Sequence, residues 1–173
     1  MKSVLISIKP KWCELIASGK KTIEVRKTIP KIETPFKCYI YSTLDGGVKG
    51  DRLVKDGHAS NAVCGMVIGE FVCDKIYDIE PHYDTTNFCN QYVCGWNAGD
   101  EDDCLSFSDL NTYLGVKHGY GWHISDLKIY DKPKELSEFS YWLGFISDGA
   151  TDNHGHLKRP PQSYMFVEEL QDV

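Results

Sequence analysis

Eight residues, GKKTIEVR at positions 19–26, connect an expected helix to an expected strand. The helix is predicted over residues 10–18, where Pro10 suits the first turn. The strand is predicted over residues 22–27 from the alternation of apolar and polar side chains. Gly19 suits the left-handed conformation that often ends a helix, so the chain is expected to turn between the two elements.

Three charged side chains of this stretch are expected to lie together. Alternate residues of a strand share one face at a spacing of roughly 6.6 Å, which puts Glu24 and Arg26 on the same side. Lys21 lies beside them at the joint between helix and strand. Such a run is often an exposed, mutually screened charge cluster, and the alternative is one cleft lined by all three side chains.

Basic residues are concentrated at the N-terminal end of the chain. Residues 1–37 contain nine Lys or Arg against three Glu, a net charge of +6, although the whole chain carries −6. This local excess predicts an anionic ligand such as phosphate, RNA or DNA. The acidic remainder argues against broad, non-specific coating of a nucleic acid.

Size and composition predict one domain over residues 1–173. Apolar residues make up 42% and charged residues 25% of the chain, as in ordinary globular proteins. No apolar run approaches the roughly 20 residues of a membrane helix, so no membrane partner is expected. The segment MKSVLISI at residues 1–8 is too short and too alternating for a signal peptide, which predicts a cytoplasmic location.

The seven cysteines argue against a disulfide scaffold, because their number is odd and no export signal is recognised. Three lie in predicted strands and are expected to be small buried hydrophobes: Cys38, Cys64 and Cys73. Three others lie in a polar, acidic segment with spacings that match no paired zinc motif: Cys89, Cys94 and Cys104. Plain loop thiols are therefore expected there, and zinc completed by His82, His154 or His156 is the alternative. We expect no required metal and no cofactor.

The overall pattern predicts an α+β, mostly β fold. Strands are expected at 3–8, 22–27, 37–42, 62–74, 121–130 and 163–168, and helices at 10–18 and 107–114. Three long polar loops are expected as insertions near residues 43–61, 80–105 and 140–158. Short strands with the internal glycines Gly65 and Gly69 favour a small mixed β-barrel with short helices at its ends.

A slip in alternation interrupts the strand expected at 121–130. Its first apolar residues occupy even positions and its later ones odd positions. One extra residue near Ser125-Asp126 would restore a common face, which predicts a β-bulge there.

Two expectations concern the segment before this strand. The acidic run at residues 100–103 is expected to be a solvated loop. The helix over residues 107–114 is expected to begin with Ser106 or Ser108 as its N-cap.

The stretch at 19–26 resembles the Gly-x-Lys-x-x-Glu-x-Arg pattern of the ASCH domain, in the PUA-like superfamily. Other segments also look like that family: residues 7–10, 67–71, 122–124, 131–133 and 160–164. The resemblance covers most predicted strands but not the three long loops. It implies a PUA-like β-barrel with a cleft beside the first helix, and a role in binding RNA or modified bases.

The resemblance also implies two possible enzymatic activities. One ASCH subgroup is an amidohydrolase acting on N4-acetylcytidine, thought to use Lys, Thr and Glu. Lys21 matches its lysine, but Glu24 occupies the position of its threonine, and its distal Glu aligns with no specific residue here. Another member is reported as a ribonuclease, so metal-independent cleavage of RNA is a further alternative.

The residues themselves favour binding of RNA, single-stranded nucleic acid or a nucleotide, including a modified nucleoside. Four cations are expected to hold phosphate: Lys9, Lys21, Arg26 and Lys27. Three aromatic residues are candidates for stacking on a base: Trp12, Tyr41 and Trp122. Glu24 would accept a hydrogen bond from an exocyclic amine or fix Arg26. If the protein is an enzyme, the catalytic candidates are Lys21, Glu24 and His123, although a structural role is the simpler interpretation of His123.

Overall fold

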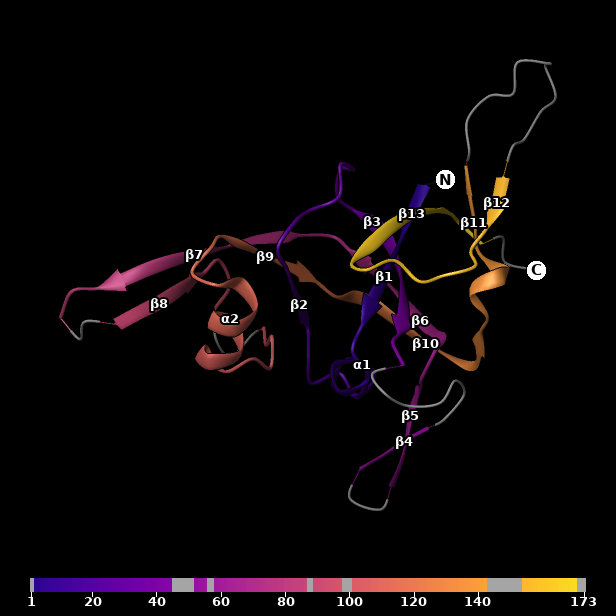
Figure 1. Ribbon diagram of the computed structural model, residues 1–173, viewed down its shortest axis with the longest axis horizontal. Coiled ribbons are helices and arrows are strands. Elements are labelled where there is room, and N and C mark those ends of the chain that lie inside the picture. The colour runs from indigo at the N-terminus through magenta and orange to yellow at the C-terminus, as the bar shows by residue number, and fades with distance from the viewer. Residues whose placement is uncertain are drawn as a thin grey trace.

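The computed structural model describes residues 2–44, 52–55, 58–86, 89–97, 101–142 and 154–170. These residues form an α+β fold in which strands predominate, as the sequence predicts. Figure 1 shows the strands as two main sheets, with two helices beside them and hairpins that project from the body. Within this part of the chain, no helix is long and apolar enough to cross a membrane.

The larger sheet has five strands in the order β10-β6-β3-β1-β13. Their bounds are β1 (Lys2–Ile8), β3 (Phe36–Ser42), β6 (Met66–Cys73), β10 (Ser125–Lys134) and β13 (Tyr164–Glu168). β1 and β3 pair in parallel, and the other neighbours are antiparallel. The helix α1 (Pro10–Ala17) follows β1 directly, as the sequence predicts.

The smaller sheet has four antiparallel strands in the order β2-β9-β7-β8. They are β2 (Ile23–Arg26), β7 (Ile76–Asp84), β8 (Cys89–Cys94) and β9 (Gly119–His123). The helix α2 (Phe107–Leu114) packs its apolar residues against β2 and β7 in one hydrophobic cluster. Figure 1 shows the β7–β8 hairpin extending away from the body beyond α2.

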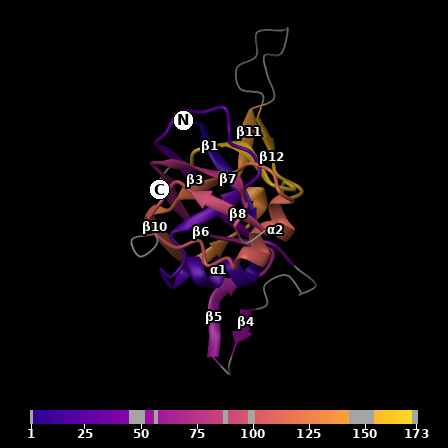
Figure 2. The same cartoon turned by 90° about the vertical axis from the view of Figure 1, so that its left-hand side faces the viewer.

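The three segments expected to be loops contain strands, so that prediction is wrong in part. β4 (Arg52–Lys55) and β5 (His58–Val63) form a hairpin in the first, and β7–β8 occupies most of the second. β11 (Ser140–Trp142) and β12 (His154–His156) pair in the third, after the 3-10 helix η1 (Leu136–Glu138). β7 is largely exposed and therefore lacks the apolar alternation that identifies a half-buried strand. Figure 2 shows β4–β5 and β11–β12 projecting in opposite directions.

Two glycines have different roles in the strand expected at 62–74. Gly65 has a φ of 74° and turns the chain between β5 and β6, so one predicted strand is two. Gly69 lies inside β6, where a Cβ atom would come 2.5 Å from the backbone oxygen of Lys128 on β10. The absence of a side chain at Gly69 therefore permits the close approach of the neighbouring strand.

The strand expected at 121–130 is divided between the two sheets. β9 pairs with β2 and β7, whereas β10 pairs with β6. The predicted bulge is confirmed, because the register shifts between Ser125 and Lys128 and Asp126 has a φ of 47°. Pairing among the described strands gives two separate main sheets, and closure into a barrel stays a prediction.

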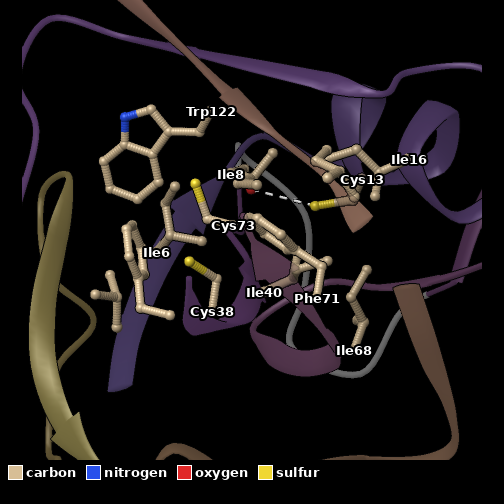
Figure 3. Close-up of a cluster of buried hydrophobic side chains, with 13 residues drawn as sticks. Ile6, Ile8, Cys13, Ile16, Cys38, Ile40, Ile68, Phe71, Cys73 and Trp122 are labelled. Carbon is tan, nitrogen blue, oxygen red and sulfur yellow. Dashed lines mark hydrogen bonds between the residues drawn. The ribbon is translucent and has the colours of Figure 1, made fainter. Parts of the chain in front are cut away.

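The main core lies between α1 and the larger sheet. Figure 3 shows Ile6, Cys38, Phe71 and Trp122 within it, on strands that are distant in the sequence. The predicted burial of three cysteines is confirmed for Cys38, Cys64 and Cys73, and Cys13 of α1 is buried as well.

Candidate functional site

A pocket of about 820 Å³ lies beside α1, β2 and α2 and is bounded on another side by residues 160–163. Six of the eight residues predicted to bind a ligand line it: Lys9, Trp12, Lys21, Glu24, Arg26 and Lys27. Five Lys or Arg side chains line the pocket against only Glu24 and Asp109. The lining is therefore positively charged, although the chain as a whole is acidic.

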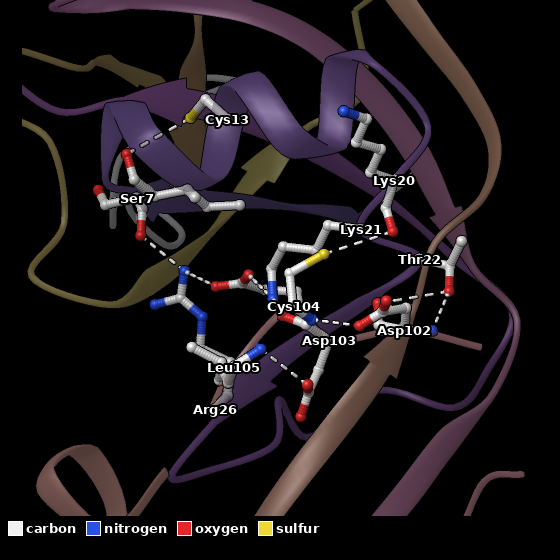
Figure 4. Close-up of polar contacts among 12 residues, drawn as sticks. Ser7, Cys13, Lys20, Lys21, Thr22, Arg26, Asp102, Asp103, Cys104 and Leu105 are labelled. Atoms are coloured by element: carbon white, nitrogen blue, oxygen red, sulfur yellow. Dashed lines mark hydrogen bonds and ion pairs between the residues drawn. The ribbon is translucent and has the colours of Figure 1, made fainter. Parts of the chain in front are cut away.

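Lys21, Glu24 and Arg26 form one buried ionic network. Lys21 is 2% exposed, and Glu24 and Arg26 are each 6% exposed. Glu24 Oε2 lies 3.5 Å from Lys21 Nζ, and Glu24 Oε1 lies 3.1 Å from Arg26 Nη2. Arg26 Nη2 also donates a hydrogen bond of 2.6 Å to the Ser7 carbonyl of β1, which Figure 4 shows. The run is thus not an exposed, screened charge cluster.

The turn after α1 brings Lys21 to this network. Gly19 has a φ of 71°, and the backbone N–H groups of Lys20 and Lys21 both donate to the Leu15 carbonyl. β2 then pairs with β9, with Glu24 opposite Trp122. The local signals of helix end and strand alternation therefore place the three charges as the sequence predicts.

Residues 101–105 form hydrogen bonds with the segment between α1 and β2, and the sequence did not predict these contacts. The N–H groups of Thr22 and Ile23 donate to the Asp102 carbonyl at 2.8 and 3.0 Å. Lys21 Nζ donates to the Asp103 carbonyl at 2.5 Å. The predicted solvated loop is wrong for Asp103, which is buried, while residue 100 lies outside the described residues. These contacts are made to backbone carbonyls, which every residue has, so no pattern of side chains could predict them.

Burial sets the ionisation of two side chains in this segment. It raises the pKa of Asp103, although the Leu105 N–H and Lys21 act in the opposite direction. Burial also raises the pKa of Cys104, whose Sγ donates to the Lys20 carbonyl at 3.4 Å. Cys104 is therefore a thiol in a backbone contact, without the features of an activated nucleophile.

Cys94 and Cys104 belong to no metal site in the described part of the chain. Burial raises the pKa of Cys94 to about 11, and the Cys89 side chain lies outside the description. Among the described residues, no group of three His, Cys, Asp or Glu side chains could hold a metal ion.

Tyr113 of α2 is a pocket residue that the sequence analysis missed. Lys27 Nζ lies 4.9 Å from the centroid of its ring, and the side chain is 38% exposed. Burial raises its pKa, although the charge of the nearby Arg26 acts in the opposite direction. The helical spacing of Asp109, Thr112 and Tyr113 could have identified this face, since it differs from the face of the buried residues Leu110 and Leu114.

The three aromatic candidates have different positions. Trp12 lines the pocket, with Lys11 Nζ at 4.0 Å and Lys21 Nζ at 5.3 Å from its ring centroid. Trp122 is 0% exposed and packs edge-on against Phe36 in the core. Tyr41 is 4% exposed, in the cluster on the other side of the larger sheet. Neither Trp122 nor Tyr41 lines the pocket, so the stacking expected of them does not fit their burial.

His123 lies outside the pocket lining and has carboxylates at both ring nitrogens. Nδ1 is 2.6 Å from Asp74 and Nε2 is 2.9 Å from Glu101. Desolvation raises the pKa of Asp74, but the hydrogen bond to His123 and the charge of His123 lower it. The pKa of Asp74 is therefore below its ordinary value. This arrangement fits the structural role, and the structure does not bring His123 to Lys21 and Glu24 as a catalytic group.

Solved ASCH structures have the fold of this chain. The crystal structure of ASCH from Zymomonas mobilis is 20% identical, with a TM-score of 0.58 over 96% of this chain and 88% of that one. A point mutant of the same Zymomonas protein has the same identity and TM-score, and the match covers 98% of this chain and 92% of the mutant chain. No protein-family model matches the chain, and no curated protein matches it. The chain therefore has the fold of an ASCH domain.

Proposed function

We propose that this ASCH-fold protein binds RNA or a nucleotide in the pocket beside Lys21, Glu24 and Arg26. The observation that carries the proposal is the positive lining of a pocket in a chain of net charge −6. A confined positive surface on an acidic protein attracts a small anionic ligand or one end of a polymer.

The side chains around the pocket offer both groups that a nucleotide requires. Lys9, Lys11 and Lys27 are exposed at the pocket and provide point charges for phosphate oxygens. Trp12 and Tyr113 contribute aromatic rings from two different helices, on which a base can stack.

The size of the pocket favours a nucleotide or the end of a strand. Its volume of about 820 Å³ lies within the range of roughly 300–1,000 Å³ that is typical of small-molecule sites. The ASCH fold adds support, because the PUA-like superfamily to which it is assigned is linked to RNA and modified bases. Closure into a PUA-like barrel and a cytoplasmic location are part of the same proposal.

Hydrolysis of a modified nucleoside is the second candidate. Its support is the buried Lys21–Glu24 pair in the pocket, together with the hydroxyl of Thr112 in the lining. Lys21 already donates to the Asp103 carbonyl, and position 24 lacks the threonine of the amidohydrolase pattern. Binding is therefore the stronger proposal.

Titration of nucleosides, mononucleotides and short single-stranded RNAs tests both candidates. We expect saturable binding that weakens in Lys9→Gln and Lys27→Gln, whose exposed side chains can be changed without disturbing the core. Lys31→Gln is the matched control, since Lys31 is exposed in the same basic segment but does not line the pocket. Absence of saturable binding by folded wild-type protein would contradict the proposal. Chromatography of N4-acetylcytidine and RNA after incubation would reveal hydrolysis.

A further inference from the structure

The buried network in the pocket contains one more cation than carboxylate. Lys21, Glu24 and Arg26 are each more than nine-tenths buried. Among the described residues, the ion pairs of Lys21 and Arg26 are both with Glu24. Lys21 contacts Asp103 through the backbone carbonyl, and the described part of the chain shows no ion pair between the Asp103 carboxylate and either cation. A buried charge without a partner is costly, and an anion entering the pocket would reduce that cost.

Arg26 has a second unmet requirement. Its Nη2 donates to the Ser7 carbonyl and pairs with Glu24, but its buried Nε has no hydrogen-bond partner in the described part of the chain. Leaving a charged donor unsatisfied costs more than leaving a neutral one. The unpartnered donor belongs to a side chain that lines the pocket, so it points to an acceptor supplied by a ligand.

We infer that the pocket recognises a terminal phosphomonoester, with its oxygens bound beside Arg26. This inference rests on the proposed function and names its ligand class. A terminal phosphate carries a charge of about −1.5 to −2 near neutral pH, whereas each internal phosphodiester carries one negative charge. Its oxygens match the fork of a guanidinium, and Lys27 lies next to Arg26 in the lining.

A terminal phosphate and an internal phosphodiester make different demands on the pocket. Residues of α1, β2, α2 and the 160–163 segment line it from several sides. An internal phosphodiester would need an exit for the strand in both directions, whereas a terminal phosphate needs one. The phosphate can belong to a free mononucleotide or to the end of an RNA strand.

Glu24 acts in this arrangement as a positioning residue. Its two carboxylate oxygens contact Lys21 and Arg26 separately. Glu24 of β2 and the Ser7 carbonyl of β1 both contact Arg26 Nη2 and so fix the guanidinium. The carboxylate is therefore engaged by the protein and does not serve to read a base.

Calorimetric titration with matched ligands tests the inference. The probes are the four common ribonucleosides, their 5′- and 3′-monophosphates, and RNA trimers with either a phosphate or a hydroxyl at each end. We expect the terminal phosphate to increase affinity by at least about tenfold, as charge-assisted contacts do. Arg26→Gln should remove most of this difference, and Lys31→Gln should preserve it.

The outcomes separate this inference from the proposed function. If nucleosides bind to wild-type protein as tightly as their monophosphates, the inference is wrong while nucleotide binding stands. If none of the probes binds, both are wrong. If the protein prefers a monophosphate to a phosphorylated trimer, the inference is supported and the ligand is a free nucleotide. If it prefers the phosphorylated trimer, the inference is supported and the ligand is the end of an RNA strand. Should Arg26→Gln fail to fold by circular dichroism, Arg26→Lys keeps the charge, removes the fork and should also reduce the phosphate effect.

Discussion

The ammonium group of Lys21 donates a hydrogen bond of 2.5 Å to the backbone carbonyl of Asp103, 82 residues further along the chain. The same ammonium group pairs with Glu24 in the pocket. Lys21 therefore connects the turn after α1 with the segment before α2, and both helices contribute residues to the lining. The integrity of the pocket and the stability of the fold depend on the same side chain.

Replacement of Lys21 by Met should destabilise the protein strongly. The change keeps an unbranched side chain without the ammonium group, and it leaves the buried Glu24 with one cation and the Asp103 carbonyl without its donor. Glu24 keeps its pair with Arg26, so the main loss is the charge-assisted hydrogen bond to the Asp103 carbonyl, and we expect a decrease of about 1.5–3 kcal/mol in the free energy of unfolding measured in urea. Lys20→Met is the matched control, because Lys20 is exposed and adjacent. Equal unfolding midpoints for the two variants would show that the Lys21 contacts contribute little.

Replacement of Asp103 by Asn should stabilise the protein near neutral pH. Burial raises the folded-state pKa of Asp103 above its ordinary value of 3.8, so the ionised carboxyl opposes folding once the pH exceeds the raised pKa. Asn cannot ionise, and its oxygen can still accept the 2.9 Å hydrogen bond from the Leu105 N–H. The stabilisation should shrink as the pH falls through the folded pKa and vanish below the unfolded pKa. Urea unfolding across this acid range measures it, and a constant difference at every pH would contradict the assignment.

The arrangement of residues 19–26 depends on local signals in the sequence. The end of α1 requires a left-handed residue, which Gly19 provides, and two-residue alternation orients Glu24 and Arg26. Neither feature depends on distant parts of the chain. The burial of the charges could not be predicted in the same way. Arg26 and Lys21 donate hydrogen bonds to the backbone carbonyls of Ser7 and Asp103, which are distant in the sequence.

The aromatic residues illustrate the limit of strand patterns. Alternation identifies which residues share a face, but Tyr41 and Trp122 lie in strands that pack on more than one side. Which aromatic side chain reaches the pocket is decided by the arrangement of the sheets. Tyr113 was missed because its helix, which the sequence did predict, was assigned only an apolar face.

The N-cap of α2 should contribute to stability through Ser106. Its hydroxyl accepts a hydrogen bond from the Asp109 N–H, and the Asp109 carboxylate accepts one from the Ser106 N–H. Ser106→Ala should lower the unfolding free energy by about 1 kcal/mol, since a Ser cap is worth roughly that amount. Ser108→Ala, the other cap candidate from the sequence, should change it by less than about 0.5 kcal/mol. Thermal unfolding compares them, and a larger effect at Ser108 would refute this cap.

Replacement of Glu24 by Gln should leave base preference unchanged. The Glu24 carboxylate contacts Lys21 and Arg26, so its loss affects how Arg26 is held and not which base is read. We expect the ratios between the dissociation constants of the four mononucleotides to stay within about threefold of wild type, or roughly 0.7 kcal/mol. Loss of discrimination between bases, with affinity for the weakest ligand retained, would instead identify Glu24 as the base-reading residue.

Affinity for short single-stranded RNA should fall with salt along a shallow slope. The cations are confined to one pocket and its exposed lysines, so only two or three phosphates can be neutralised together. At about −0.7 per phosphate, the log–log slope should be roughly −1.4 to −2.1. The double variant Lys9→Gln/Lys27→Gln should flatten it by up to about 1.4, while Lys31→Gln should preserve it. Fluorescence anisotropy over a series of potassium chloride concentrations gives these slopes. A much steeper slope, reduced equally by Lys31→Gln, would mean that RNA follows the whole basic N-terminal segment and not the pocket.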